Sequence, residues 1–452
     1  YYAMFVPDHG ARWQGNLKKL KVVNSQQVDR EGNAAIDDNG NIDKAAKTFW
    51  RSTPQADGNN VKAGGVAQML QDKSNRNVLS DLGTSGALID FTQNNAEISF
   101  GGAASLASEM GITQDKISEY ITWAKGFDVE DVDNDGLVTD NRPDIFGDPL
   151  HSKPLIVNYG GSASGQDIRI IVGTNSGALH MFKDNGNTVD ENWAFMPKEF
   201  FSRYRTLKNN FTSSGKVYGI DGSATSYLLD INGDGTIDSD SGDKAWIFFG
   251  LRRGGSSYYG LDISTPNAPK LLWKIDHKTS GFDELGQSWS QPKVIYSSLN
   301  IVNGVAKPAV VFGAGYDTGK DNQGVGVDDS KGRGIFIVDA ASGTLKWSVT
   351  PNEASSTNSQ FSGFTDGITG SVAVLDSDSD GITDRFYAAD TGGNIWRVDM
   401  PGNSPFSAST PWTVHKLAEL GGTSLTTDRR FFSEPSIVRT FISDTIEINS
   451  ID

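Results

Sequence analysis

The chain has no cysteine, which excludes a disulfide framework, a thiolate zinc site and a cysteine nucleophile. It also has no run of 18 apolar residues, so the sequence predicts no transmembrane helix. Positive charge is in deficit: 40 Lys and Arg stand against 56 Asp and Glu, a formal net charge of −16. This balance argues against a nucleic-acid-binding surface and against a basic helix lying on a membrane, because both need clustered positive charge.

Catalytic signatures are also scarce. The five histidines form no metal-ligating spacing, and neither a Gly-x-Ser-x-Gly elbow nor a phosphate-binding loop occurs. His180 is expected to be a core or groove residue, and His151 is expected to hydrogen-bond Asp148 in a structural role. Acidic residues are plentiful, but the sequence singles out no catalytic pair among them.

Glycine is abundant, with 51 of 452 residues, and this favours many short strands joined by turns. The chain also repeats itself. The stretch 152–157, Ser-Lys-Pro-Leu-Ile-Val, recurs at 290–295 and 433–438, with looser copies at 221–224 and 369–373. The prolines of the three clear copies are 138 and 143 residues apart, so the repeat period is about 70 residues.

A second signature accompanies the first: an apolar strand that ends in Asp, then a turn, then often a Trp, as in 334–347. Short strands, glycine turns and a long repeat predict an all-β fold, a β-propeller of about six to seven blades, with an incomplete ring as an alternative. The tryptophans are expected to fill blade-to-blade contacts. Arg252 and Arg253 are expected to tie blades together, with ligand contact as the alternative.

Three regions are predicted along the chain. Residues 1–30 are expected to be N-terminal propeller strands, because 15–20 resemble a blade strand, and 31–147 are expected to be an insertion. Within this insertion, 61–73 and 113–125 carry helix signals, and Thr113 is a candidate cap. The main propeller is expected to cover 148–452, with its last blade truncated.

Two segments, 230–238 and 376–384, match an acidic calcium-binding loop. Calcium takes about six to eight oxygen ligands, and carboxylate or amide oxygens at positions 1, 3 and 5 of such a loop point inward. Glycine at position 6 allows the sharp turn, position 7 supplies a backbone carbonyl, and aspartate at position 9 adds another oxygen. The predicted ligands are Asp230, Asn232, Asp234, Thr236 and Asp238 in one loop, and Asp376, Asp378, Asp380, Ile382 and Asp384 in the other.

A third segment, 131–140, fits this pattern less fully, because position 9 is Thr139 and the aspartate follows one place later. Its predicted ligands are Asp131, Asp133, Asp135, Leu137 and Asp140, with Asp128 as an additional candidate. None of the three loops has the glutamate at position 12 that an EF-hand needs. We therefore expect two calcium ions, with a third as a further candidate.

The flanking residues place the loops 230–238 and 376–384 between apolar runs that read as strands, so each is expected to connect a hairpin within a blade. Their first aspartates are 146 residues apart, about two repeat periods, which favours equivalent positions. Acidic runs rich in Asn and Gly also form plain turns, and that interpretation remains the alternative.

Several segments together resemble a known family over nearly the whole chain. They are 1–5, 10–18, 147–154, 172–180, 193–197, 250–255 and 392–399. In this order they resemble the C-terminal domain of PilC/PilY-type proteins, the type IV pilus tip-associated adhesins and biogenesis factors. The resemblance implies a modified quinoprotein-like β-propeller, secreted to the pilus tip, the outer cell surface or the periplasm of a Gram-negative bacterium.

The resemblance further implies a protein that works by binding and not by catalysis. Its partners would be minor pilins at the pilus tip and receptors on host or abiotic surfaces. It would support pilus assembly, oppose retraction, and contribute to attachment and twitching motility. The family's regulatory calcium loop corresponds to 376–384, and the second full loop at 230–238 leaves open which of the two is regulatory.

Two other functions remain as alternatives. A quinone-cofactor dehydrogenase is one, because the turn at 342–347 resembles quinoprotein blades, although such enzymes often use a vicinal disulfide that this chain cannot form. The other is a purely structural scaffold stabilised by calcium.

Overall fold

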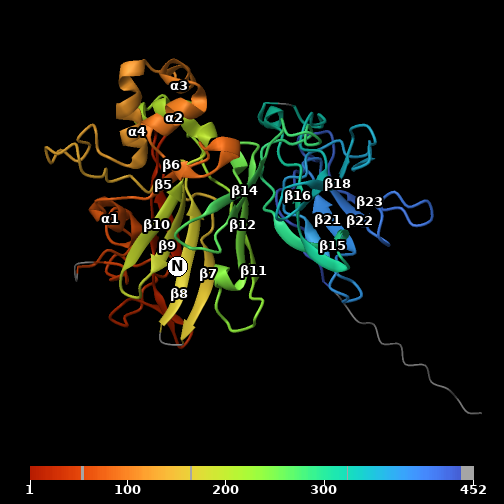
Figure 1. The fold of residues 1–452 in the computed structure, drawn as a ribbon, viewed down its shortest axis with the longest axis horizontal. Coiled ribbons are helices and arrows are strands. Elements are labelled where there is room, and N and C mark those ends of the chain that lie inside the picture. Colours follow the sequence, from red (N-terminus) through yellow and green to blue (C-terminus); the bar gives the residue numbers. More distant parts are fainter. Residues whose placement is uncertain (52–54, 163–164, 323, 439–452) are drawn as a thin grey trace, which may run out of the picture.

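The computed structural model describes residues 1–51, 55–162, 165–322 and 324–438. Four sheets stand side by side along the chain, each built mainly from antiparallel strands that are connected in sequence (Figure 1). The first contains β7 (Leu155–Ser162), β8 (Gly165–Gly173), β9 (Leu179–Asp184) and β10 (Val189–Phe195). The second contains β11 (Thr225–Leu229), β12 (Lys244–Gly250), β13 (Tyr258–Asp262) and β14 (Lys270–Ile275).

The C-terminal half repeats this plan twice. The third sheet contains β15 (Lys293–Val302), β16 (Val305–Gly313), β17 (Ile335–Asp339), β18 (Leu345–Thr350) and β19 (Asn358–Gln360). The fourth contains β20 (Ala373–Leu375), β21 (Arg385–Ala389), β22 (Asn394–Asp399) and β23 (Thr413–Glu419). Sheets of this kind, packed face to face in series, are the blades of a β-propeller. The described residues hold four of them, and the blade count of a closed ring stays a prediction.

The repeated Ser-x-Pro motif has a structural role in each sheet that carries it. The Ser152 hydroxyl accepts a hydrogen bond from the backbone N–H of Gly173 at 2.9 Å. The Ser290 hydroxyl accepts the same bond from Gly313, also at 2.9 Å. In both sheets the motif therefore fastens the start of the first strand to the end of the second, which explains why the sequence repeats there.

The tryptophans join neighbouring sheets, as the sequence predicts. Trp193 on β10 is fully buried and donates its indole N–H to the carbonyl of Pro266 in the second sheet at 2.9 Å. Trp273 on β14 donates to the carbonyl of Ala340 in the third sheet at 2.8 Å. Trp347 on β18 packs edge-on against Trp412, next to the fourth sheet, with ring centroids 4.9 Å apart. These side chains fill the blade-to-blade contacts.

The arginine pair also bridges sheets. Arg253 lies 3.1 Å from Asp321 of the third sheet, and a terminal nitrogen of Arg252 lies 2.9 Å from His151, which precedes the first sheet. The Arg252 guanidinium also lies 3.4 Å from the carboxylate of Asp221, which belongs to its own blade. One expectation nearby is wrong: His151 contacts Asp221 at 2.8 Å and not Asp148. Asp148 is already occupied, because its carboxylate accepts bonds from Asn175 and Lys216.

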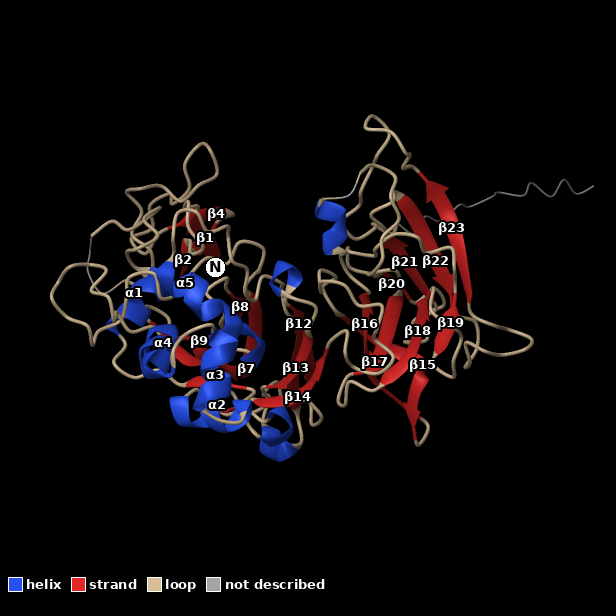
Figure 2. Ribbon diagram, turned by 90° about the horizontal axis from the view of Figure 1, so that it is seen from above, coloured by secondary structure: helices blue, strands red, loops and turns tan. Residues whose placement is uncertain are grey.

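The N-terminal region contains most of the helices, which gather around the first sheet (Figure 2). The predicted helices at 61–73 and 113–125 are found as α1 (Gly65–Asp72) and α4 (Ile117–Lys125), although Thr113 makes no side-chain cap. Three further helices were not predicted: α2 (Gln93–Phe100), α3 (Ala103–Met110) and α5 (Tyr204–Asn209).

The N-terminal strands belong to two kinds of sheet. β1 (Tyr2–Val6) and β2 (Gln14–Lys18) form a two-stranded sheet of their own, as do β3 (Lys21–Val23) and β4 (Gln26–Val28). β5 (Val78–Ser80) instead pairs in parallel with β10, and β6 (Ile89–Asp90) pairs with β5. Residues 78–90 therefore extend the first blade. The predicted regional boundaries at 30 and 147 stay predictions, and residues 439–452 of the last region lie outside the described residues.

No helix in the described part of the chain is both long and apolar enough to cross a membrane.

Candidate metal centres

The three acidic loops share a left-handed backbone at positions 4 and 6, although position 1 is left-handed only at Asp131. Position 4 is left-handed in every loop, at Asn134 (φ 59°), Gly233 (φ 70°) and Ser379 (φ 67°). Position 6 is left-handed as well, at Gly136 (φ 87°), Gly235 (φ 80°) and Gly381 (φ 87°). Glycine occupies position 6 each time because a β-carbon is strained in this region. The common conformation identifies the three segments as versions of one structure.

Their internal hydrogen bonds also agree. The position-1 carboxylate accepts the backbone N–H of position 6 in each loop, in the pairs Asp131–Gly136 (3.1 Å), Asp230–Gly235 (2.8 Å) and Asp376–Gly381 (2.9 Å). The position-5 carboxylate accepts the N–H of position 7, in the pairs Asp135–Leu137 (2.8 Å), Asp234–Thr236 (2.8 Å) and Asp380–Ile382 (2.7 Å). These bonds fold each loop back on itself.

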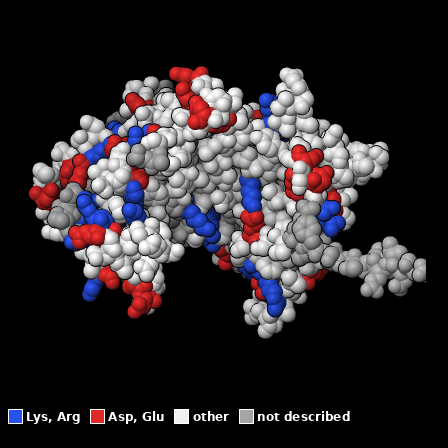
Figure 3. Space-filling model, turned by 90° about the horizontal axis from the view of Figure 1, so that it is seen from below, with Lys and Arg blue, Asp and Glu red and all other residues white. Residues whose placement is uncertain are grey.

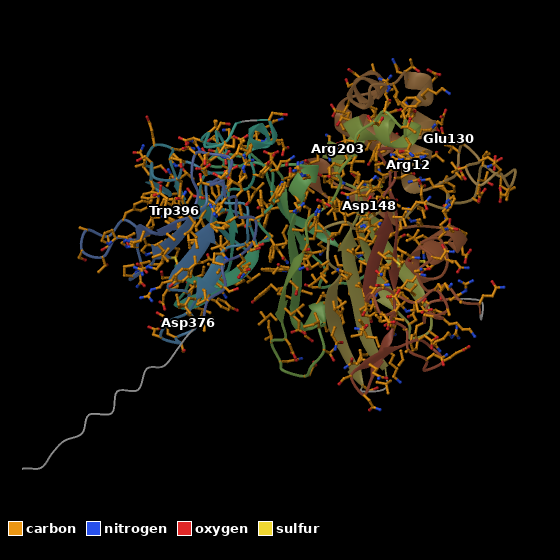
Figure 4. All side chains as sticks on the ribbon, turned by 180° about the vertical axis from the view of Figure 1, so that it is seen from behind. Arg12, Glu130, Asp148, Arg203, Asp376 and Trp396 are labelled. Atoms are coloured by element: carbon orange, nitrogen blue, oxygen red, sulfur yellow. The ribbon has the colours of Figure 1, made fainter. Side chains whose placement is uncertain are left out.

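Carboxylates gather closely in two of the loops. Asp131, Asp133 and Asp135 form one triad, and Asp376, Asp378 and Asp384 form the other; in each, ligand oxygens lie within 4.8 Å of one another. Either triad could hold a metal ion, since calcium favours several carboxylate oxygens. The two lie far apart, as the positions of Glu130 and Asp376 show (Figure 4).

Asp384 completes its triad and also anchors the start of the loop through hydrogen bonds. Its carboxylate accepts hydrogen bonds from the backbone N–H of Ser377 at 2.6 Å and from the Ser377 hydroxyl at 2.7 Å. Burial alone would raise the pKa of Asp384, but these bonds outweigh burial and the pKa is lowered. Asp384 is therefore held in its charged form and fixes the entry of the loop.

The loop 230–238 achieves the same anchoring with a residue that the sequence reasoning missed. Asp243, which is fully buried, accepts the backbone N–H of Ile231 at 2.9 Å and that of Asp238 at 2.9 Å. These bonds lower the pKa of Asp243. The side chain of Asp238, predicted at position 9, instead accepts the N–H of Asp240 at the start of a short 3₁₀ turn.

A signal for Asp243 does exist in the sequence. Asp243 stands immediately before β12, as Asp384 stands immediately before β21. Both loops are thus anchored by an aspartate that stands immediately before the second strand of the hairpin, although the two loops differ in length. The residues Asp230, Asp234 and Asp238 do not form a triad of the kind found in the other two loops.

Replacing Asp243 by alanine is expected to destabilise the protein by about 1–3 kcal/mol, because two backbone N–H groups lose their acceptor. Asp238→Ala is the matched control and is expected to cost about 1 kcal/mol or less, since it removes only a turn cap. Urea unfolding of both variants in calcium-free buffer measures the difference. Equal losses would contradict the assignment of Asp243 as the anchor.

The third loop is closed at its base by Asp128 and Asp140, whose backbones are joined by a hydrogen bond of 2.9 Å. The Asp128 carboxylate, 1% exposed, accepts the N–H of Val132 at 2.8 Å, the role that Asp384 has toward Ser377. One oxygen of Asp128 and one of Asp140 are buried without a hydrogen-bond partner.

This arrangement concentrates negative charge. Burial raises the pKa of Asp140, and repulsion from Asp135, Asp133 and Asp128 raises it further. A bound cation would reverse the repulsion and supply the missing partners of the buried oxygens. The base of the loop thus fits a metal ion together with the triad above it.

The two hairpin loops also contact the preceding blade in the same way. The backbone N–H of Ile237, at position 8, donates to the carbonyl of Tyr159 on β7 at 3.0 Å. The N–H of Thr383, also at position 8, donates to the carbonyl of Tyr296 on β15 at 2.9 Å. An ordered loop therefore adds a bond between blades.

Four sheets in series, two of them with an acidic loop between their first two strands, define a β-propeller protein with candidate divalent-cation sites. The sequence profile of the PilY1 beta-propeller domain matches residues 148–425, and the chain belongs to this family.

Relatives named as type IV pilus biogenesis factors agree with this assignment. The chain is 31% identical over 287 residues to the type IV pilus biogenesis factor PilY1 of Pseudomonas aeruginosa strain UCBPP-PA14, covering 58% of this chain and 21% of that protein. It is 29% identical over 246 residues to a PilY1 homolog of Xylella fastidiosa, covering 52% of this chain and 14% of the homolog. The matched region thus spans about a fifth or less of these relatives.

The crystal structure of the P. aeruginosa PilY1 C-terminal domain matches with 25% sequence identity and a TM-score of 0.41. The match covers 60% of this chain and 50% of that domain.

Proposed function

We propose that this chain is the calcium-binding propeller of a type IV pilus biogenesis factor and tip adhesin, and that it acts by binding and not by catalysis. The observation that carries the proposal is the pair of aspartate triads, each set in a loop of the same conformation. All their ligand atoms are oxygens, and such a ligand set favours calcium over the transition metals, which bind nitrogen and sulfur ligands more readily. The family assignment supplies the link to the pilus.

Each loop would hold its ion through a defined set. In the loop 376–384 this set is the triad with Asp380 and the carbonyl of Ile382. In 131–140 it is the triad with the carbonyl of Leu137, Asp140 and Asp128. In 230–238 it is Asp230, Asn232, Asp234, the carbonyl of Thr236 and either Asp238 or Asp243.

Calcium would act by fixing the loops against neighbouring blades. Position 8 of each hairpin loop already donates to the preceding blade, so an ion that rigidifies the loop strengthens this joint. Ordering the loops would shift the population toward one binding state of the propeller. At the pilus tip, outside the cell or in the periplasm, that state would favour contact with minor pilins and surface receptors, support assembly and oppose retraction.

Isothermal titration with calcium should give two sites from the triads and a third from 230–238. The expected dissociation constants are about 10⁻⁴–10⁻³ M or somewhat tighter. Calcium at a hundred times the dissociation constant should stabilise the fold by about 2.7 kcal/mol per site. Magnesium, which demands tighter octahedral geometry, is the control and should give a smaller shift of the melting temperature. No heat of binding and no shift with calcium would refute the proposal.

A purely structural role for calcium is the second candidate, and the bonds between the hairpin loops and the preceding blades favour it. The two candidates differ in what the pilus does. Loss of calcium binding that leaves assembly and retraction unchanged would select the scaffold. The quinone-dependent enzyme stays a prediction, and the relatives are named for pilus biogenesis rather than for a reaction.

A further inference from the structure

The copies of the Ser-x-Pro repeat converge on one polar cavity of about 350 Å³. It is lined by residues of 151–153, 222–223, 250–252, 288–291, 369–371 and 432–434. Four of these segments, 151–153, 222–223, 288–291 and 369–371, lie just before the first strand of a blade, so the cavity lies where the blades meet. None of its lining residues belongs to the three acidic loops. The cavity is therefore a separate feature from the candidate metal centres.

The charged side chains that line this cavity are mostly cationic. Lys153 and Arg252 line it, and the only acidic side chain in its lining, Glu434, is neutralised by an ion pair with Lys293. The formal net charge of the chain is −16, and acidic side chains form separate clusters on the surface in Figure 3. Arg252 is ion-paired with the buried Asp221, so Lys153 supplies the unpaired positive charge of the cavity lining, and Arg252 supplies further N–H donors.

Lys153 has a free ammonium group. Its backbone N–H is fixed by a 2.9 Å hydrogen bond to the Ser223 hydroxyl of the next blade, and its side chain is exposed. Among the described residues its ammonium nitrogen has no hydrogen bond or ion pair. The backbone is therefore anchored while three N–H donors remain available to a ligand.

The Arg252 side chain is held in position by its contacts, and its backbone adopts an unfavourable conformation. Its φ of 52° lies in the left-handed region, which is unfavourable for a residue with a β-carbon. The guanidinium stacks 4.2 Å from the ring centroid of Trp289, and one of its terminal nitrogens contacts His151 and Asp221. Its other nitrogens have no partner among the described residues. The side chain is thus preorganised, with donors left over.

We propose that this cavity binds an oxyanion, a carboxylate or phosphate group, through Arg252 and Lys153. Arginine presents a planar fork of N–H donors that matches the two oxygens of such a group, and lysine adds a mobile point charge. The backbone strain at Arg252 and the unused donors are accounted for by this role. The contacts of Arg252 with His151 and Asp221 use only one nitrogen of its guanidinium group.

The test is calorimetric titration of the protein with three probes: succinate, inorganic phosphate and the capped dipeptide acetyl-Glu-Glu-amide. Saturable binding is expected for at least one of them, and it should weaken as salt is added. Binding of succinate or phosphate identifies a free anion as the ligand, whereas binding of the dipeptide alone identifies a carboxylate carried by a polypeptide. Absence of saturable binding for all three overturns the proposal.

Two variants locate the site. Lys153→Gln and Arg252→Gln should each weaken binding about tenfold or more, because each removes charge-assisted hydrogen bonds. Lys270→Gln, on the exposed start of β14, removes the same charge outside the cavity and should leave affinity unchanged. Lys153→Gln is decisive should Arg252→Gln disturb folding, because the Lys153 ammonium makes no hydrogen bond or ion pair within the described protein. Unchanged affinity in Lys153→Gln refutes the site, while the calcium proposal stands or falls separately.

Discussion

Replacing Trp273 by alanine is expected to destabilise the protein by about 3–5 kcal/mol, the range typical of a large buried aromatic truncated to alanine. Trp273 is 6% exposed and stacks on Phe248, with ring centroids 5.6 Å apart. A β-carbon placed on Gly260 or Gly343 would come within 2.7 Å of its ring atoms, so the ring fits between the second and third sheets without spare room. Its loss would open a cavity between two blades.

Urea unfolding measures this loss, and two variants separate its causes. Trp273→Phe keeps a ring but leaves the carbonyl of Ala340 without its donor, and should cost less than the alanine change. Leu417→Ala on β23, where the leucine is 48% exposed, should change stability by no more than about 0.5 kcal/mol. A Trp273→Ala protein as stable as the Leu417→Ala protein would show that the blade contact does not depend on this ring.

The repeat could be predicted from the sequence because its clear copies have the same local structural role. Ser152 and Ser290 both hold the end of the second strand of their sheet, so the motif recurs at the start of these two blades. The acidic loops could be predicted for the same reason, since glycine at position 6 and aspartate at positions 1 and 5 are fixed by local geometry. Structural features that depend on residues close together in the chain can therefore be predicted from the sequence.

Features set by distant contacts were missed. Helix α2 buries a single alanine, Ala96, among its eight residues, so it shows no apolar periodicity. Its end was nevertheless marked by Gly101 in the left-handed conformation, the usual residue after a helix. Asp243 was overlooked because its distance from the loop start differs from the expected spacing, although its place before β12 is the structural constant.

Asp384→Ala should abolish calcium binding at the loop 376–384 and should also destabilise the calcium-free protein by about 1–3 kcal/mol. The second effect follows because the backbone N–H and the hydroxyl of Ser377 lose their common acceptor. Asp378→Asn should separate the two effects. The Asp378 carboxylate accepts only a 3.2 Å bond from the N–H of Asp380, so its amide variant loses a charged ligand and little else. Calcium calorimetry and urea unfolding of both variants give the comparison.

The pilus provides the deciding measurement for Asp378→Asn, because this variant should be folded without calcium and still fail to respond to it. Introduced into the full-length protein in its host bacterium, it should alter pilus extension or retraction and reduce twitching motility. Asp328→Asn, an exposed carboxylate outside the three loops, is the matched control and should behave as wild type. Normal twitching in an Asp378→Asn strain whose protein binds no calcium at this loop would exclude regulation through 376–384. In that case regulation would have to act through another loop, or calcium would serve the fold alone.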